Sequence, residues 1–142
     1  MFHSKSMLAF VLAILLFCAP ALAQEPQTLW TELGTGSNEM TLVVVFPDLT
    51  TKGYHIHSDQ PTLLAALLDV GLVTVQENDG VTKLVMVDGC SLPEENPDAY
   101  WFISMYDPAL DSLTPATLPI DQLPLAGQTY AFGMINGAKA QE

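Results

Sequence analysis

The chain has 142 residues, of which 49% are apolar and 14% charged, and its 16 acidic and 4 basic side chains give a formal net charge of −12. The apolar fraction excludes intrinsic disorder, and the length allows one ordinary domain. All four basic residues are Lys, so the chain lacks both the basic surface that nucleic acid or anionic lipid requires and the Arg fork that clamps phosphate.

Residues 1–23 have the pattern of a secretory signal peptide. Lys5 precedes an uncharged apolar run at 7–18, and an Ala-Leu-Ala sequence at 21–23 supplies the small residues of a cleavage site. The run is shorter than the roughly 20 residues of a membrane span, although a retained anchor helix is the alternative. We therefore expect a secreted, periplasmic or cell-envelope protein with no membrane span after cleavage. Cys90 would then be its single thiol.

The predicted domain begins with a β-hairpin. Residues 24–38 contain Pro and Gly without a clear period, which indicates a leader or linker, and the domain itself is expected at 39–142. Residues 40–46 (MTLVVVF) are β-branched and aromatic over the length of a strand and stop at Pro47. Residues 50–57 (TTKGYHIH) alternate between apolar and polar, so the two predicted strands pair as a hairpin.

A change of hydrophobic period after the hairpin predicts one helix of about three turns. Asp59 is a candidate N-cap, Pro61 fits a first turn, and Gly71 is free to adopt the positive φ that ends a helix. The apolar stripe consists of Leu63, Leu64, Leu67 and Leu68. So short a helix must pack on the sheet to be stable.

The rest of the chain is predicted to form strands separated by turns and one irregular crossover with four prolines. Beyond the helix, the main strands are expected at 81–87, 100–105 (YWFISM) and 127–135, with 72–75 as a further short candidate not counted in the order, the turn at 78–80 and the crossover at 107–124. The order is then β-β-α-β-β-β. One short helix packed on a mixed sheet of about five strands predicts an α+β fold.

Four segments in this order resemble the transcobalamin-like C-terminal domain, a β-grasp-type module of exported bacterial proteins. They are 62–68 (TLLAALL), 84–89 (LVMVDG), 96–102 (NPDAYWF) and 125–132 (LAGQTYAF). The resemblance implies a β-grasp-like fold without catalysis. In animal cobalamin carriers the module holds cobalamin against a large helical barrel, which this chain has no residues to build. The resemblance therefore implies a cobalamin-like or other flat ligand held together with a partner domain.

The aromatic strand is the first candidate binding site. In the cobalamin carriers this edge of the module faces the flat corrin ring, so the resemblance points to Tyr100, Trp101 and Phe102 as ligand-binding residues. Aromatic faces suit large planar ligands. The alternative is core packing, because strand alternation places Tyr100 and Phe102 on one face and Trp101 on the other, and one face must be buried.

Two histidines form a weaker candidate for a metal site. His55 and His57 are two residues apart on one predicted strand, so both rings lie on the same face, and imidazole is a ligand for zinc or copper. The sequence shows no evident third ligand, although Asp48 or Asp59 could approach. A solvated sheet face explains the pair equally well.

We expect no enzyme, because the sequence contains no nucleophile elbow, HExxH motif or paired carboxylates. Cys90 has the acidic neighbours Glu94, Glu95 and Asp98, which would raise its pKa and oppose a nucleophilic role. The sequence therefore predicts an exported ligand-binding or interaction module that requires no cofactor and could bind cobalamin. Its partner would be a small molecule or another exported protein. The alternative is an extracellular or cell-surface structural module that contacts another protein.

Overall fold

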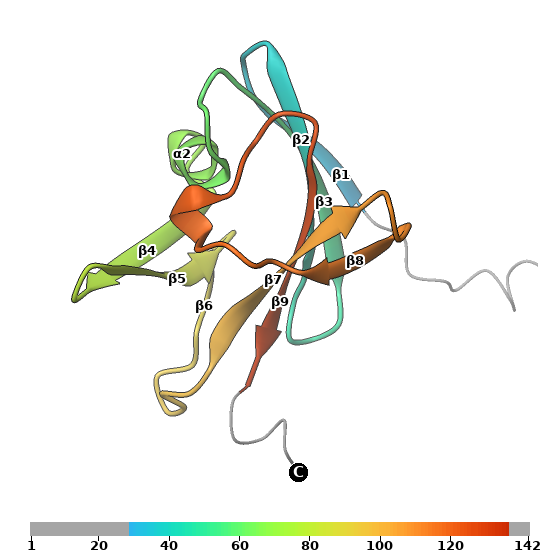
Figure 1. The fold of residues 1–142 in the computed structure, drawn as a ribbon. Coiled ribbons are helices and arrows are strands. Elements are labelled where there is room, and N and C mark those ends of the chain that lie inside the picture. Colours follow the sequence, from blue (N-terminus) through green and yellow to red (C-terminus); the bar gives the residue numbers. More distant parts are fainter. Residues whose placement is uncertain (1–28, 137–142) are drawn as a thin grey trace, which may run out of the picture.

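The computed structural model describes residues 29–136, which form two β-sheets, one α-helix and one 3-10 helix (Figure 1). The predicted signal peptide at 1–23 lies outside the described residues. The strands are β1 (Leu29–Gly34), β2 (Asn38–Val45), β3 (Thr51–Ser58), β4 (Val73–Asn78), β5 (Val81–Val87), β6 (Cys90–Ser91), β7 (Tyr100–Asp107), β8 (Ser112–Pro115) and β9 (Thr129–Ile135). The helices are α2 (Leu63–Asp69) and η1 (Ile120–Gln122).

The larger sheet has six strands in the order β1-β3-β2-β9-β7-β8, and the smaller has three in the order β4-β5-β6. β2 and β3 pair antiparallel, which confirms the predicted hairpin. β1 runs parallel to β3 and β9 runs parallel to β2, whereas β7 is antiparallel to both β9 and β8. The fold is thus largely β, with one short α-helix and a mixed sheet.

One face of the larger sheet carries the core. Helix α2 packs against η1, β3 and β4 and covers part of this face (Figure 1). The largest side chains below 2% exposure are Tyr130, Phe132, Met40, Leu42, Ile56, Leu63, Leu67, Leu123 and Leu125. Burial of each contributes roughly 1.5–3 kcal/mol, so this face anchors the sheet and leaves the opposite face available to solvent.

The predicted linker and the predicted strand number both need correction. Residues 29–34, which we assigned to a leader, form the edge strand β1. Most of its side chains are exposed, so its sequence has no buried period to reveal it. The predicted crossover at 107–124 contains β8 and η1, and β4, β5 and β6 form a sheet of their own instead of extending the larger one.

The N-cap of helix α2 lies three residues after Asp59, the residue that the sequence predicts. Thr62 is the N-cap, and its Oγ1 accepts a hydrogen bond from the Ala65 N–H at 3.3 Å. The Asp59 carboxylate instead accepts from the Ser37 N–H at 2.8 Å, which ties the end of β3 to the loop before β2. The predicted end is confirmed, since Gly71 has a φ of 73° immediately after the C-cap Val70. Within residues 29–136, none of the helices has the length and apolar character needed to cross a membrane.

Candidate metal centre

Three neighbouring strands bring carboxylates and imidazoles together on the outer face of the larger sheet. His55 on β3 is the register partner of Glu32 on β1 and of Thr41 on β2. Glu39 on β2 is the register partner of His57. Register partners in a sheet point to the same face, so these side chains gather on the face opposite the core.

The ligand atoms of Glu32, Glu39 and His55 all lie within 4.8 Å of one another. His55 Nδ1 is 3.4 Å from Glu39 Oε2 and 3.7 Å from Glu32 Oε2. His57 Nε2 lies 2.8 Å from the other Glu32 oxygen, Oε1, within hydrogen-bonding distance. Glu32 therefore bridges the two histidines, with one oxygen toward each ring.

The two separations that involve His55 are close to the ligand spacing around a small cation. Zinc binds imidazole nitrogen and carboxylate oxygen at about 2.0–2.2 Å, so two ligands on a tetrahedral ion lie about 3.3 Å apart. The two His55–carboxylate distances exceed that value by only a few tenths of an ångström. Small side-chain movements would thus let one ion contact all three groups.

A tryptophan lies directly beside this centre. The Trp30 indole packs edge-on against the His55 ring, with a centroid distance of 4.6 Å and an interplanar angle of 84°. The indole also lies on the backbone of Gly53, where an added Cβ would come within 2.5 Å of the ring. Gly53 is the register partner of Trp30, so the absence of a side chain there creates the seat for the indole. Trp30 nevertheless remains 52% exposed.

The further candidate metal ligands beside His55 are Glu32 and Glu39, and not Asp48 or Asp59 as the sequence suggested. His55 and His57 share one sheet face, as the spacing predicts, but the Asp48 carboxylate accepts hydrogen bonds from the N–H and hydroxyl of Thr50. The Asp59 carboxylate likewise accepts a hydrogen bond from the Ser37 N–H. Sequence reasoning missed Glu32 because it stands in the segment assigned to a linker. Alternation of Glu39 with the buried Met40 and Leu42 could have placed that carboxylate on the outer face.

The aromatic strand distributes its rings between the two faces of the sheet. Trp101 is 5% exposed and belongs to the core, whereas Tyr100 is 45% exposed and Phe102 is half-buried. Among the described residues, Trp101 Nε1 has no hydrogen-bond partner. The hollows beside Cys90, beside Met134 and beside Thr41 are not lined by these rings. The assignment of Tyr100, Trp101 and Phe102 as ligand-binding residues remains a prediction.

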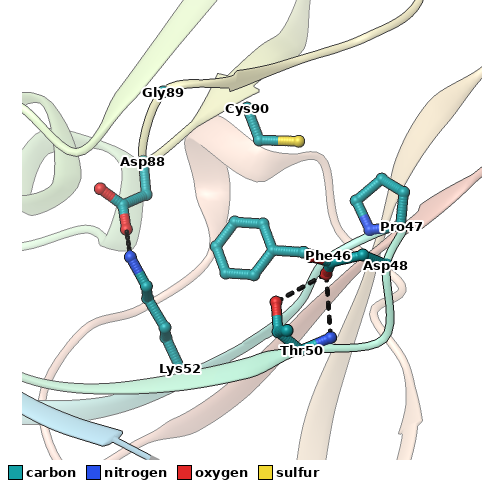
Figure 2. A pocket seen from close by; sticks show the side chains of 8 residues that line it. All are labelled: Phe46, Pro47, Asp48, Thr50, Lys52, Asp88, Gly89 and Cys90. Carbon is teal, nitrogen blue, oxygen red and sulfur yellow. Dashed lines mark hydrogen bonds and ion pairs between the residues drawn. The ribbon is translucent and has the colours of Figure 1, made fainter.

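Cys90 lies in a different hollow, of about 410 Å³, between the β2–β3 turn and the β5–β6 turn (Figure 2). Burial and the nearby Asp48 carboxylate raise the pKa of the Cys90 thiol. A raised pKa reduces the thiolate fraction, which opposes nucleophilic chemistry as the sequence predicted. The charge responsible is on Asp48, across the hollow, and not on the acidic loop that follows Cys90.

No model of a known protein family matches the sequence, and no curated protein matches it either. The fold is similar to the crystal structure of a protein from Ruminococcus gnavus whose description suggests that it binds metal. The TM-score is 0.61 at 18% sequence identity, and the match covers 71% of this chain and 99% of the other. At this identity the likeness shows a shared fold.

Proposed function

We propose that the protein is a non-catalytic binding module that coordinates a divalent transition-metal ion through His55, Glu32 and Glu39. The observation that carries this proposal is the convergence of three ligand atoms from three adjacent strands within 4.8 Å. The suggested metal binding of the structurally similar Ruminococcus gnavus protein supports it. Each ligand stands on a paired strand, and rigid elements hold ligand geometry more precisely than loops do.

The donor set favours a zinc-like ion. Imidazole nitrogen suits zinc, copper, iron and nickel, whereas magnesium and calcium prefer sites built from oxygen alone. His57 would act beside the ligands, because its contact with Glu32 Oε1 aims Oε2 at His55. Partners of this kind typically change metal affinity by about 10–100-fold.

We also propose kinship with the transcobalamin-like C-terminal domain. Support comes from the strand order β3-β2-β9-β7-β8, in which the last strand lies parallel to the first strand of the opening hairpin, at the centre of the sheet. Such an arrangement is expected of a β-grasp sheet. The same proposal includes export directed by the segment at 1–23. It also includes a flat ligand that is held at Tyr100 against a partner domain. Mass spectrometry of the secreted protein tests the export, and the mature chain is expected to begin at Gln24.

Calorimetric titration of untagged protein with Zn²⁺ tests the metal site. We expect one ion per chain, with affinity reduced about 100-fold or more in His55→Ala and Glu39→Gln, and about 10-fold in His57→Ala. Glu95→Gln removes the same charge from an exposed loop and serves as the matched control. Unchanged affinity in His55→Ala, or an equal loss in Glu95→Gln, would show that zinc binds elsewhere.

A further inference from the structure

A second feature of the outer sheet face adjoins the metal centre. The register aligns Thr129 on β9 with Thr41 on β2, Thr41 with His55 on β3, and His55 with Glu32 on β1. These four side chains form a cross-strand row that we call the polar row. The metal centre occupies its β3–β1 end, and two threonines occupy the other end.

A hollow of about 400 Å³ opens at the threonine end of the polar row. It shares His55 and Glu39 with the metal centre, so an ion bound there would form part of the wall. Its other lining residues are Ser37, Asn38, Met40, Thr41, Gly127, Gln128 and Thr129. Gly127 has a φ of 72°, and no atom lies within 4 Å of where its Cβ would be, so the turn leaves that side of the hollow open.

The lining is rich in polar groups but poor in charge. Glu39 is its single acidic residue, and no Lys contributes to it. Among the described residues, no side-chain hydrogen bond engages the hydroxyl of Thr41 or Thr129 or the amide of Gln128. Hydroxyl and amide groups donate and accept hydrogen bonds, which suits a ligand with many hydroxyls. Apart from the ion itself, an anionic ligand would meet no lysine here.

Three protein ligands also leave a metal ion with an open coordination position. An ion on the exposed face of the sheet would complete its shell with oxygen from solvent or from a ligand in the adjoining hollow. The half-exposed indole of Trp30, packed against His55, adds an apolar surface at the other end of the site. Metal, hydroxyl-binding groups and an aromatic ring are thus all within one strip of sheet.

We infer that the metal centre binds a neutral polyhydroxylated ligand of the carbohydrate class, one of whose hydroxyls completes the metal coordination while others bond to Thr41 and Gln128. This inference rests on the proposed metal site and adds a ligand to it. The ion contributes affinity directly, so sugar binding requires the metal. The hollow sets which of the remaining hydroxyls are recognised.

The test has two stages, both with untagged protein. Zn²⁺ is titrated first, and the loaded protein is then titrated with methyl α-D-mannopyranoside, methyl β-D-galactopyranoside and methyl β-D-glucopyranoside, with Trp fluorescence and calorimetry as readouts. Tetrahydropyran-2-methanol, a similar ring without adjacent ring hydroxyls, is the ligand control. We expect at least one sugar to bind at least 10-fold more tightly with Zn²⁺ than with EDTA, and the control to show no such gain.

Two variants separate the hollow from the metal. Thr41→Val and Gln128→Ala should leave zinc affinity unchanged and weaken sugar binding about 10-fold, whereas Thr117→Val, an exposed loop position, should alter neither. Zinc binding without metal-dependent binding of any of the three sugars would overturn this inference and leave the proposed function standing. Tighter binding of citrate than of every sugar would also overturn it. Failure of zinc itself to bind would remove both.

Discussion

Asp88 connects the two sheets through a single carboxylate oxygen. It stands in the turn between β5 and β6, where its Oδ2 accepts a hydrogen bond from Tyr54 OH on β3 at 2.5 Å and lies 3.1 Å from Lys52 Nζ (Figure 2 shows the lysine contact). Partial burial raises the pKa of Asp88, but the interactions with Tyr54 and Lys52 together lower it by more. The resulting pKa lies below the ordinary value of an aspartate. The ionised carboxylate therefore stabilises the folded state.

Replacement of this carboxylate should alter stability in a pH-dependent way. A carboxyl whose pKa is lowered on folding contributes stability above its unfolded pKa of about 4, and loses it as the pH falls through the folded value. We expect Asp88→Asn to lower the free energy of unfolding by about 1 kcal/mol at pH 7 and by much less near pH 2. Urea unfolding at both pH values, with the exposed Asp69→Asn as control, measures this. An equal loss at both pH values would contradict the role of the charge.

Gly53 fixes the position of the Trp30 indole because it has no side chain. A Cβ at this position would meet the indole at 2.5 Å, so Gly53→Ala should push Trp30 off the sheet and away from His55, at a cost of about 1–2 kcal/mol. Acrylamide quenching of Trp fluorescence should increase, because Trp101 is buried and contributes little to the accessible signal. Gly133→Ala, where nothing lies within 4 Å, is the matched control. Identical quenching in both variants would show that Gly53 does not seat the indole.

At the scale of elements, sequence patterns succeeded where one face is buried. The β-branched run of β2, the alternation in β3, three of the four predicted stripe leucines of α2 (Leu68 is exposed) and the Asp79-Gly80 turn, whose φ values are 52° and 78°, all leave local signals. β1 leaves none, because an exposed edge strand gains its pairing from β3 and not from its own period. Only part of the candidate site could therefore be predicted from the sequence: the two histidines on β3 could, but Glu32 on β1 could not.

An ion at the proposed site would join β1 to the two strands beside it. Its ligands stand on β1, β3 and β2, and β1 is otherwise an exposed edge. Saturating Zn²⁺ should therefore slow amide hydrogen exchange in Leu29–Gly34 by at least about 10-fold, since only the docked strand completes the site. The opposite edge strand β8 is an internal control and should not respond. Equal protection of both edges would indicate a general effect, and Glu32→Gln should abolish the response in β1.

For the whole molecule, the sequence predicted one short helix on a mixed sheet but not the division of the strands into two sheets. A lone helix among strands predicts helix-on-sheet packing, and that is observed. Two tight turns, at 79–80 and 88–89, pair β5 with β4 and with β6, and both leave local signals. Whether these strands also join β7 in one sheet is decided by tertiary packing, which local sequence does not encode.

The same molecule-wide view predicts how an ion should change thermal stability. An ion that binds only the folded chain, at 100 times its dissociation constant, adds about 2.7 kcal/mol to the free energy of unfolding. For a domain of this size, that corresponds to a rise in Tm of roughly 10 °C or more. Differential scanning calorimetry with Zn²⁺ and then EDTA measures the rise and its reversal. His55→Ala at the same zinc concentration should show at most about 0.4 kcal/mol of this stabilisation, because a site 100-fold weaker is then no more than half occupied. A full rise in that variant would place the stabilising ion away from the β1-β3-β2 face.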